Sequence, residues 1–192
     1  FRGEHEAAAA AYQEASKRGH KSQPGLAQLW SAQGHIDKAA EEIRRLLVQV
    51  THRRHRSHLL LASVEILLAA GLVLEARVSA EELSKLDAEL RTPLSYAASS
   101  HAIGAVLLGE DRPQQALVAL RDATTTWDEI GARYHSAKAR VLMAGAHREL
   151  GDEVAAKAEL LAAAQLFDAL GAAADRLHAE EFYRRKAGAD DT

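Results

Sequence analysis

The sequence predicts an all-α fold in which helix pairs stack into an array, and three observations carry this prediction. The segment WDEIG at residues 127–131 returns forty residues later as FDALG at residues 167–171. Self-similarity at a period of about 20 to 50 residues is typical of stacked helical repeats. Hydrophobic residues make up 47% of the 192 residues but aromatic residues only 5%, which favours helices that pack closely through alanine. With three prolines and no alternating β-branched runs, little of the chain is left for strands.

Each repeat has an alanine where its second helix packs against the first, and a turn five residues earlier. These anchors are spaced 31, 37, 40 and 40 residues apart: Ala8, Ala39, Ala76, Ala116 and Ala156. The turn residues are Gly3, Gly34, Gly71, Asp111 and Gly151. Glycine supplies the positive φ that ends a helix tightly, and Asp111 either tolerates the same conformation or caps the next helix. The residues seven positions before the turn are mostly small, as close helix pairs require: Ala27, Val64, Gly104 and Ala144.

The pattern predicts ten helices in order along the chain. Their ranges are 4–18, 24–33, 36–50, 54–70, 73–89, 93–109, 112–130, 133–150, 152–170 and 173–187. Prolines support these starts, since Thr92 and Pro93 read as an N-cap and first turn, and Pro24 and Pro113 occupy similar places.

No linker divides the chain, so we expect residues 1–192 to form a single repeat domain. The first helix has no preceding partner and the chain opens on Phe1, so we also expect a fragment of a longer protein. The segment 172–187 then reads as a terminal helix that either caps the array or connects it to a following domain.

This spacing of small and apolar residues resembles that of the tetratricopeptide repeat over nearly the whole chain. The family's Trp, Tyr and Pro positions are largely missing, and the period exceeds the usual length of about 34 residues. The stretch ALVALRDATTTWDEIGARYHSAKARVLMAGAHRELGDEVAAKAELLAAAQLFDALGAAADRL looks like the C-terminal repeat region of large bacterial LuxR-type (MalT-like) transcriptional regulators. The resemblance implies a right-handed superhelix of about five repeats. It also implies a regulatory module placed before a DNA-binding helix-turn-helix.

The charge balance argues against direct DNA binding by this segment. Its 24 basic and 27 acidic residues give a net charge of −3, whereas a phosphate-binding domain is expected to be basic. We therefore expect DNA contact only through a domain outside this segment. Two local basic runs lie between repeats, at residues 17–21 and 52–58. They would either attract a phosphate or an acidic partner, or complement the C-terminus of a helix.

Metal binding and catalysis are both disfavoured. His52, His55 and His58 recur at intervals of three, but a helix brings only two of them together, and the arginines between them repel a dication. The chain has no cysteine, which excludes disulfides and thiolate sites. Phosphate-binding glycine loops, nucleophile elbows and HExxH pairs are missing as well. We expect no enzyme activity and no cofactor.

The location expected from the sequence is the cytoplasm. No run of eighteen apolar residues occurs, because Glu65 and Gly71 interrupt the longest candidate. The chain also shows no signal peptide.

The remaining candidate site is the groove lined by the first helix of each repeat. Its expected residues are Lys21, Gln28, Ser31, His58, Leu61, Glu65, Leu68, Ala98, His101, Ala105, Leu108, Lys138, Val141 and Arg148. They form an apolar stripe framed by basic residues, which suits an amphipathic helix or a partly apolar peptide. The chain contains no asparagine, so the paired-asparagine carboxylate clamp known in this repeat family is disfavoured. The other interpretation is that the stripe is core, covered by a neighbouring helix or by a second copy of the chain in a homodimer.

Two functions follow from these observations. The first is a regulatory module of a transcriptional activator, in which the repeats bind a protein, a peptide or a small-molecule effector and act on a separate DNA-binding domain. The second is a free-standing scaffold that assembles other proteins.

Overall fold

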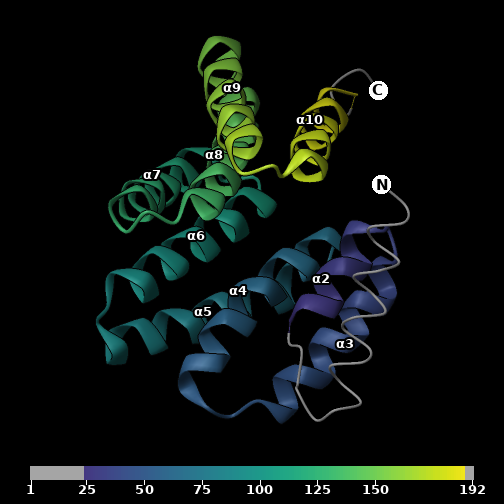
Figure 1. The fold of residues 1–192 in the computed structure, drawn as a ribbon, viewed down its shortest axis with the longest axis vertical. Helices are drawn as coiled ribbons and strands as arrows, with labels where there is room; N and C mark the ends of the chain where they lie inside the picture. Colours follow the sequence, from purple (N-terminus) through teal and green to yellow (C-terminus); the bar gives the residue numbers. More distant parts are fainter. Residues whose placement is uncertain (1–23, 189–192) are drawn as a thin grey trace. The chain divides into compact units, whose positions relative to one another are not determined.

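The computed structural model describes residues 24–188, and within them every regular element is a helix (Figure 1). The helices are α2 (Gly25–Ala32), α3 (Ile36–Gln49), α4 (Arg53–Ala69), α5 (Val73–Leu90), α6 (Pro93–Gly109), α7 (Pro113–Glu129), α8 (Arg133–Glu149), α9 (Glu153–Ala169) and α10 (Ala173–Gly188). The all-α prediction is confirmed, and the predicted boundaries agree within one or two residues. The helix expected at residues 4–18 lies outside the described residues.

The helices belong to two compact units, which we describe separately. Unit 1 extends to Leu86 and contains α2, α3, α4 and most of α5. Unit 2 begins at Asp87 and contains the last turn of α5 together with α6 to α10. The expectation of a single domain over residues 1–192 stays a prediction.

The helices follow one another at an interval half as long as the sequence repeat. From α4 to α10 they begin at residues 53, 73, 93, 113, 133, 153 and 173, so the repeat of forty residues consists of two successive steps of twenty. From α4 to α10, five of the six steps end in the same turn. The N–H of Gly131, with φ of +72°, donates to the Asp128 carbonyl at 3.1 Å, and the N–H of Ala132 donates to the Trp127 carbonyl at 2.8 Å. This pair of bonds is the Schellman motif.

The same two bonds close the turns at Gly34, Gly71, Asp111, Gly151 and Gly171. Asp111 has a φ of +57°, which confirms that aspartate takes the place of glycine there. The turn between α5 and α6 is built differently. Arg91 has a φ of +49°, and its N–H donates to the Asp87 carbonyl at 2.8 Å. Thr92 then caps α6 in a reciprocal capping box with Ser95.

Small residues allow the helices of unit 2 to approach closely. A Cβ atom added to Gly104 would lie 2.6 Å from Leu120 Cγ, so α6 and α7 have no space for a methyl group at this point. Ala144 occupies the corresponding position of α8 and is fully buried. The sequence prediction of small residues at the helix crossings is met at both positions.

Helix α10 packs against α8 and α9 through its buried residues Ala179 and Tyr183. Ala179 joins a core cluster with Phe167 of α9, and Tyr183 packs on Ala144 of α8. The predicted terminal helix therefore exists, and it covers apolar surface of the preceding helix pair.

Candidate functional site

The predicted groove residues of unit 1 lie on α2 and α4 with mixed exposure. Gln28 and His58 are exposed, and Ser31, Glu65 and Leu68 are half-buried. Leu61 is only 6% exposed, which is what the core interpretation of the stripe expects at this position. Lys21 lies outside the described residues.

The predicted groove residues of unit 2 divide in the same way. On α6, His101 and Leu108 are 1% and 3% exposed, and Ala98 and Ala105 are buried as well. On α8, Lys138, Val141 and Arg148 are half-buried. The four positions on α6 are therefore closed to a ligand in this conformation, and those on α8 are partly accessible.

Helix α10 occupies much of the accessible surface beside Arg148. The guanidinium of Arg148 lies 4.0 Å from the centre of the Tyr183 ring and donates to the Tyr183 carbonyl at 2.7 Å. It also pairs with Glu153 at 3.2 Å. The Tyr183 hydroxyl donates to the same Glu153 carboxylate at 2.9 Å. Burial raises the pKa of the Tyr183 phenol, and the hydrogen bond to Glu153 raises that pKa further. Arg148 thus holds α10 in place.

The second basic run, residues 52–58, contributes to the structure through one arginine. Arg56 donates from Nη1 to the carbonyls of Leu47 and Val50 at 2.6 and 2.7 Å, at the C-terminal end of α3. It also pairs with Glu82 of α5. This is the predicted cation at a helix C-terminus. The other described members of the run, His52, Arg53, His55 and His58, are exposed. The first run, residues 17–21, lies outside the described residues.

A further ion pair on the surface of unit 1 joins α3 to α5. Arg44 donates two hydrogen bonds to Glu75, at 2.8 and 2.7 Å. The hydrogen bond from Arg44 lowers the pKa of the Glu75 carboxyl.

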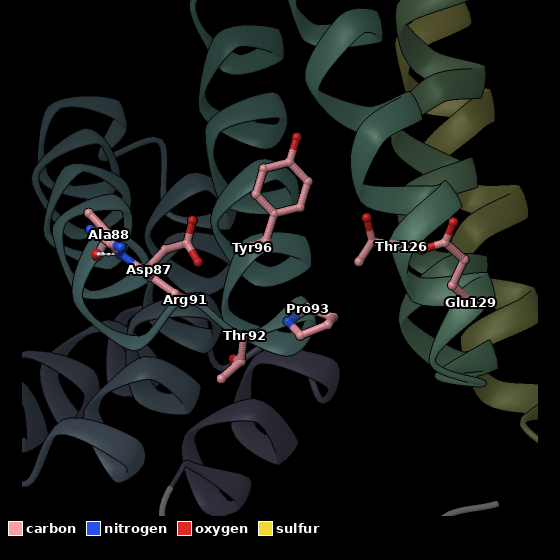
Figure 2. A pocket seen from close by; sticks show the side chains of 8 residues that line it. All are labelled: Asp87, Ala88, Arg91, Thr92, Pro93, Tyr96, Thr126 and Glu129. Atoms are coloured by element: carbon pink, nitrogen blue, oxygen red, sulfur yellow. Dashed lines mark hydrogen bonds between the residues drawn. The ribbon is translucent and has the colours of Figure 1, made fainter.

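Unit 2 contains a hollow of about 610 Å³ between the C-terminal turn of α5, the start of α6 and the end of α7 (Figure 2). We call it the Tyr96 hollow. It is lined by Asp87, Ala88, Arg91, Thr92, Pro93, Tyr96, Thr126 and Glu129. Figure 2 shows the Tyr96 side chain between Asp87 and Arg91 on one side and Thr126 and Glu129 on the other. All eight residues belong to unit 2.

Hydrogen bonds hold the two ends of the Tyr96 hollow. The Ser95 hydroxyl donates to Asp87 Oδ1 at 2.6 Å, and the Tyr96 hydroxyl lies 3.5 Å from Asp122 Oδ2. Arg91 Nε donates to the Ala88 carbonyl at 3.2 Å. In the described part of the chain, Asp87 and Glu129 form no ion pair with a basic side chain.

The repeat explains why there is a hollow at this junction. Forty residues further on, Trp127 and His135 stand in place of Asp87 and Ser95, and their rings stack with centroids 4.6 Å apart. The large ring pair fills the space that the small hydrogen-bonded pair leaves open.

The next repeat also has a different residue at the position that corresponds to Tyr96. Ser136 occupies it in the next repeat and is fully buried, whereas Tyr96 is 45% exposed. Thr126 and Glu129 are replaced there by Leu166 and Ala169. The polar and aromatic lining is therefore particular to the first of these two junctions.

No residue of the Tyr96 hollow was among the predicted site residues, which lie on the groove face. Thr92 and Pro93 were predicted only as the start of a helix. A signal was available in the repeat alignment, because Asp87 replaces the aromatic residue that WDEIG and FDALG share at that position.

The described residues show neither a metal site nor a membrane helix. No group of three or more histidine, aspartate or glutamate side chains between residues 24 and 188 is placed to hold a metal ion. Over the same range, no helix combines the length and apolar character needed to cross a bilayer.

No protein-family model matches this sequence, and no curated protein matches it either. The functional interpretation therefore rests on the geometry and on the resemblance described above.

Proposed function

We propose that this chain is a non-catalytic regulatory repeat module of a bacterial LuxR-type transcriptional regulator, acting in the cytoplasm. In this proposal the first helices of the repeats bind a protein, a peptide or a small effector. The result is passed to a DNA-binding module elsewhere in the same polypeptide. The net charge of −3 supports the assignment of DNA contact to another module.

The observation that carries the proposal is the unbroken series of helices at twenty-residue steps from α4 to α10, joined by short turns. Within each unit, such a series presents side chains from successive helices to a ligand, which is how helical repeats bind extended partners. At predicted groove positions, Gln28 and His58 of unit 1 are exposed, and Lys138 of unit 2 is half-buried. Leu68 of unit 1 and Val141 of unit 2 are half-buried at further predicted groove positions.

The first test is to read the coding sequence on both sides of this segment. A helix-turn-helix encoded downstream would support the regulator. An open reading frame without any DNA-binding module would favour the free-standing scaffold.

The second test is genetic. Deletion of the gene should change the transcript levels of a defined set of genes, and the wild-type gene should restore them. A His58→Glu variant introduces a negative charge at an exposed groove position. It should fail to restore the regulation of these genes. Lys85→Glu, on the exposed side of α5, is the matched control and should restore it. Unchanged transcripts after deletion would refute the regulator.

A further inference from the structure

We propose that the Tyr96 hollow is a second binding site, which takes the positively charged side chain of an arginine or lysine from a partner protein. The site does not depend on the regulatory function proposed above. At 3.6 residues per turn, Tyr96 is rotated by about 140° from His101 and about 180° from Ala105 around α6. It therefore points away from the predicted groove, and a partner in the hollow would leave the groove face unoccupied.

The charges around the hollow favour a cation. The carboxylates of Asp87 and Glu129 line it, and the Asp122 carboxylate lies beside the Tyr96 hydroxyl. Arg91 is the single basic residue in the lining. Because Asp87 and Glu129 have no basic partner among the described residues, an incoming guanidinium or ammonium group can pair with either carboxylate. It would displace no existing ion pair.

The Tyr96 ring supplies the second element of the site. Its side chain is 45% exposed and lies between the two acidic walls in Figure 2. The face of an aromatic ring attracts a cation, and arginine is the side chain most often found in such contacts. An arginine that stacks on Tyr96 would enter a hollow that the Asp87 and Glu129 carboxylates line.

The openness of the hollow favours a protein partner over a free small molecule. Of the eight lining residues, only Asp87 and Thr126 are half-buried, and the other six are exposed. Small-molecule sites usually bury most of the ligand surface. A side chain that projects from a partner protein can also be buried in an open hollow, because the rest of the partner covers the rim of the hollow.

The next junction of the same array shows that the hollow is not required for folding. There the Trp127 and His135 rings stack on each other, and the helix starts keep their spacing of twenty residues. The acidic and aromatic lining is therefore particular to the first junction, where both the side chains and the turn between the helices differ.

The test is a titration of the isotopically labelled chain with a blocked peptide of alternating arginine and glycine, followed by amide NMR shifts. At millimolar peptide, shifts should concentrate at residues 87–96 and 122–129. A peptide with citrulline in place of arginine keeps the shape but loses the charge, and it should produce no such shifts. Absence of shifts with the arginine peptide, or equal shifts with citrulline, would overturn the proposal.

Variants separate the two elements of the site. Glu129→Gln should weaken binding about threefold, the size expected for one exposed ion pair. This change removes a negative charge from the C-terminal end of α7 and so does not threaten folding. Tyr96→Ala should weaken binding by about two- to fivefold, whereas Tyr96→Phe keeps the ring and should bind as the wild type does. Glu41→Gln, at an exposed position of α3 in unit 1, is the control.

Two results would contradict the assignment. If Glu129→Gln and Glu41→Gln bind the peptide equally well, the hollow is not the site. If free arginine amide binds as tightly as the peptide, the ligand is a small organic cation and not a partner protein. Circular dichroism of each variant shows whether Tyr96→Ala has remained folded, and Tyr96→Phe tests the ring if it has not.

Discussion

The substitution Gly104→Ala tests how closely α6 and α7 pack, because it adds a single methyl group where the two helices meet. Glycine in the middle of a helix is unfavourable by about 1 kcal/mol relative to alanine, so Gly104→Ala would stabilise an isolated α6. In the structure the new Cβ would lie 2.6 Å from Leu120 Cγ, 2.8 Å from Leu120 Cδ2 and 3.3 Å from the Ala116 carbonyl oxygen. Leu120 is fully buried and has no solvent-filled space to enter. Overpacking of this kind costs about 1 to 3 kcal/mol.

We therefore expect Gly104→Ala to lower the free energy of unfolding by up to about 2 kcal/mol, once the gain in helix propensity is subtracted. Urea unfolding followed by circular dichroism measures this change. A second variant identifies the cause. Leu120→Ala alone should cost about 2 to 5 kcal/mol because it leaves a cavity, but it also removes the two Leu120 atoms that lie closest to the new methyl group.

In the Leu120→Ala background, Gly104→Ala should become stabilising by up to about 1 kcal/mol. The sign of its effect would thus reverse between the two backgrounds. The reverse substitution at the corresponding position of α8, Ala144→Gly, should simply destabilise by about 1 kcal/mol or more. If Gly104→Ala stabilises the wild-type chain, or if its effect is the same with and without Leu120, the close approach of α6 and α7 is refuted.

Four further predictions concern contacts and turns at the ends of helices. Arg56→Ala should lower the free energy of unfolding by about 1 to 2 kcal/mol in urea denaturation, because two carbonyls of α3 lose a charged donor. Arg56→Lys should recover only part of this free energy, since an ammonium group lacks the planar arrangement of donors that a guanidinium has. Tyr183→Phe should cost about 0.5 to 1.5 kcal/mol through its lost bond to Glu153. Because the pKa of Tyr183 is raised in the folded chain, this contribution is complete below about pH 10 and is lost as the pH rises through the folded pKa. A spectrophotometric tyrosinate titration should therefore lose its highest-pH step in the variant, and an unchanged curve would contradict the assignment. Gly131→Ala should cost about 1 kcal/mol purely through its positive φ, since nothing lies within 4 Å of the new Cβ. Arg91→Gly should raise the free energy of unfolding by a few tenths of a kcal/mol or more, because glycine adopts the positive φ of this position without strain. A lower stability in thermal unfolding would show instead that the Arg91 side chain stabilises its turn.

The helices and turns were predictable because their signals are local. Thr92 and Pro93 start α6, and Asp111 replaces glycine at a positive φ, as the sequence indicated. Turn chemistry depends on the conformations that a few consecutive residues can adopt. The twenty-residue step was less evident, because the two helices of a repeat differ in sequence while sharing the same turn.

The exposure of the groove residues was harder to predict. Helical periodicity shows which residues share a face, but it does not show which neighbouring element covers that face. His101 and Leu108 share a face with exposed positions in the pattern, yet both are buried. Arg148 was predicted as a basic residue that frames the groove, and in the structure it binds Tyr183, thirty-five residues later in the chain. Neither outcome is encoded within one helix.

The Tyr96 hollow shows where function can arise in such an array. The two junctions share the spacing of their helix starts, but they differ in their turns, and Asp87 and Ser95 stand where Trp127 and His135 stand in the next repeat. A backbone that repeats tolerates this exchange because each junction needs only a pair of side chains that satisfy each other. Stacked rings do so by filling space, and a hydroxyl and a carboxylate do so by a hydrogen bond that leaves the space empty. The repeat therefore determines the fold, and the departures from the repeat are the places where a binding site can form without loss of the fold.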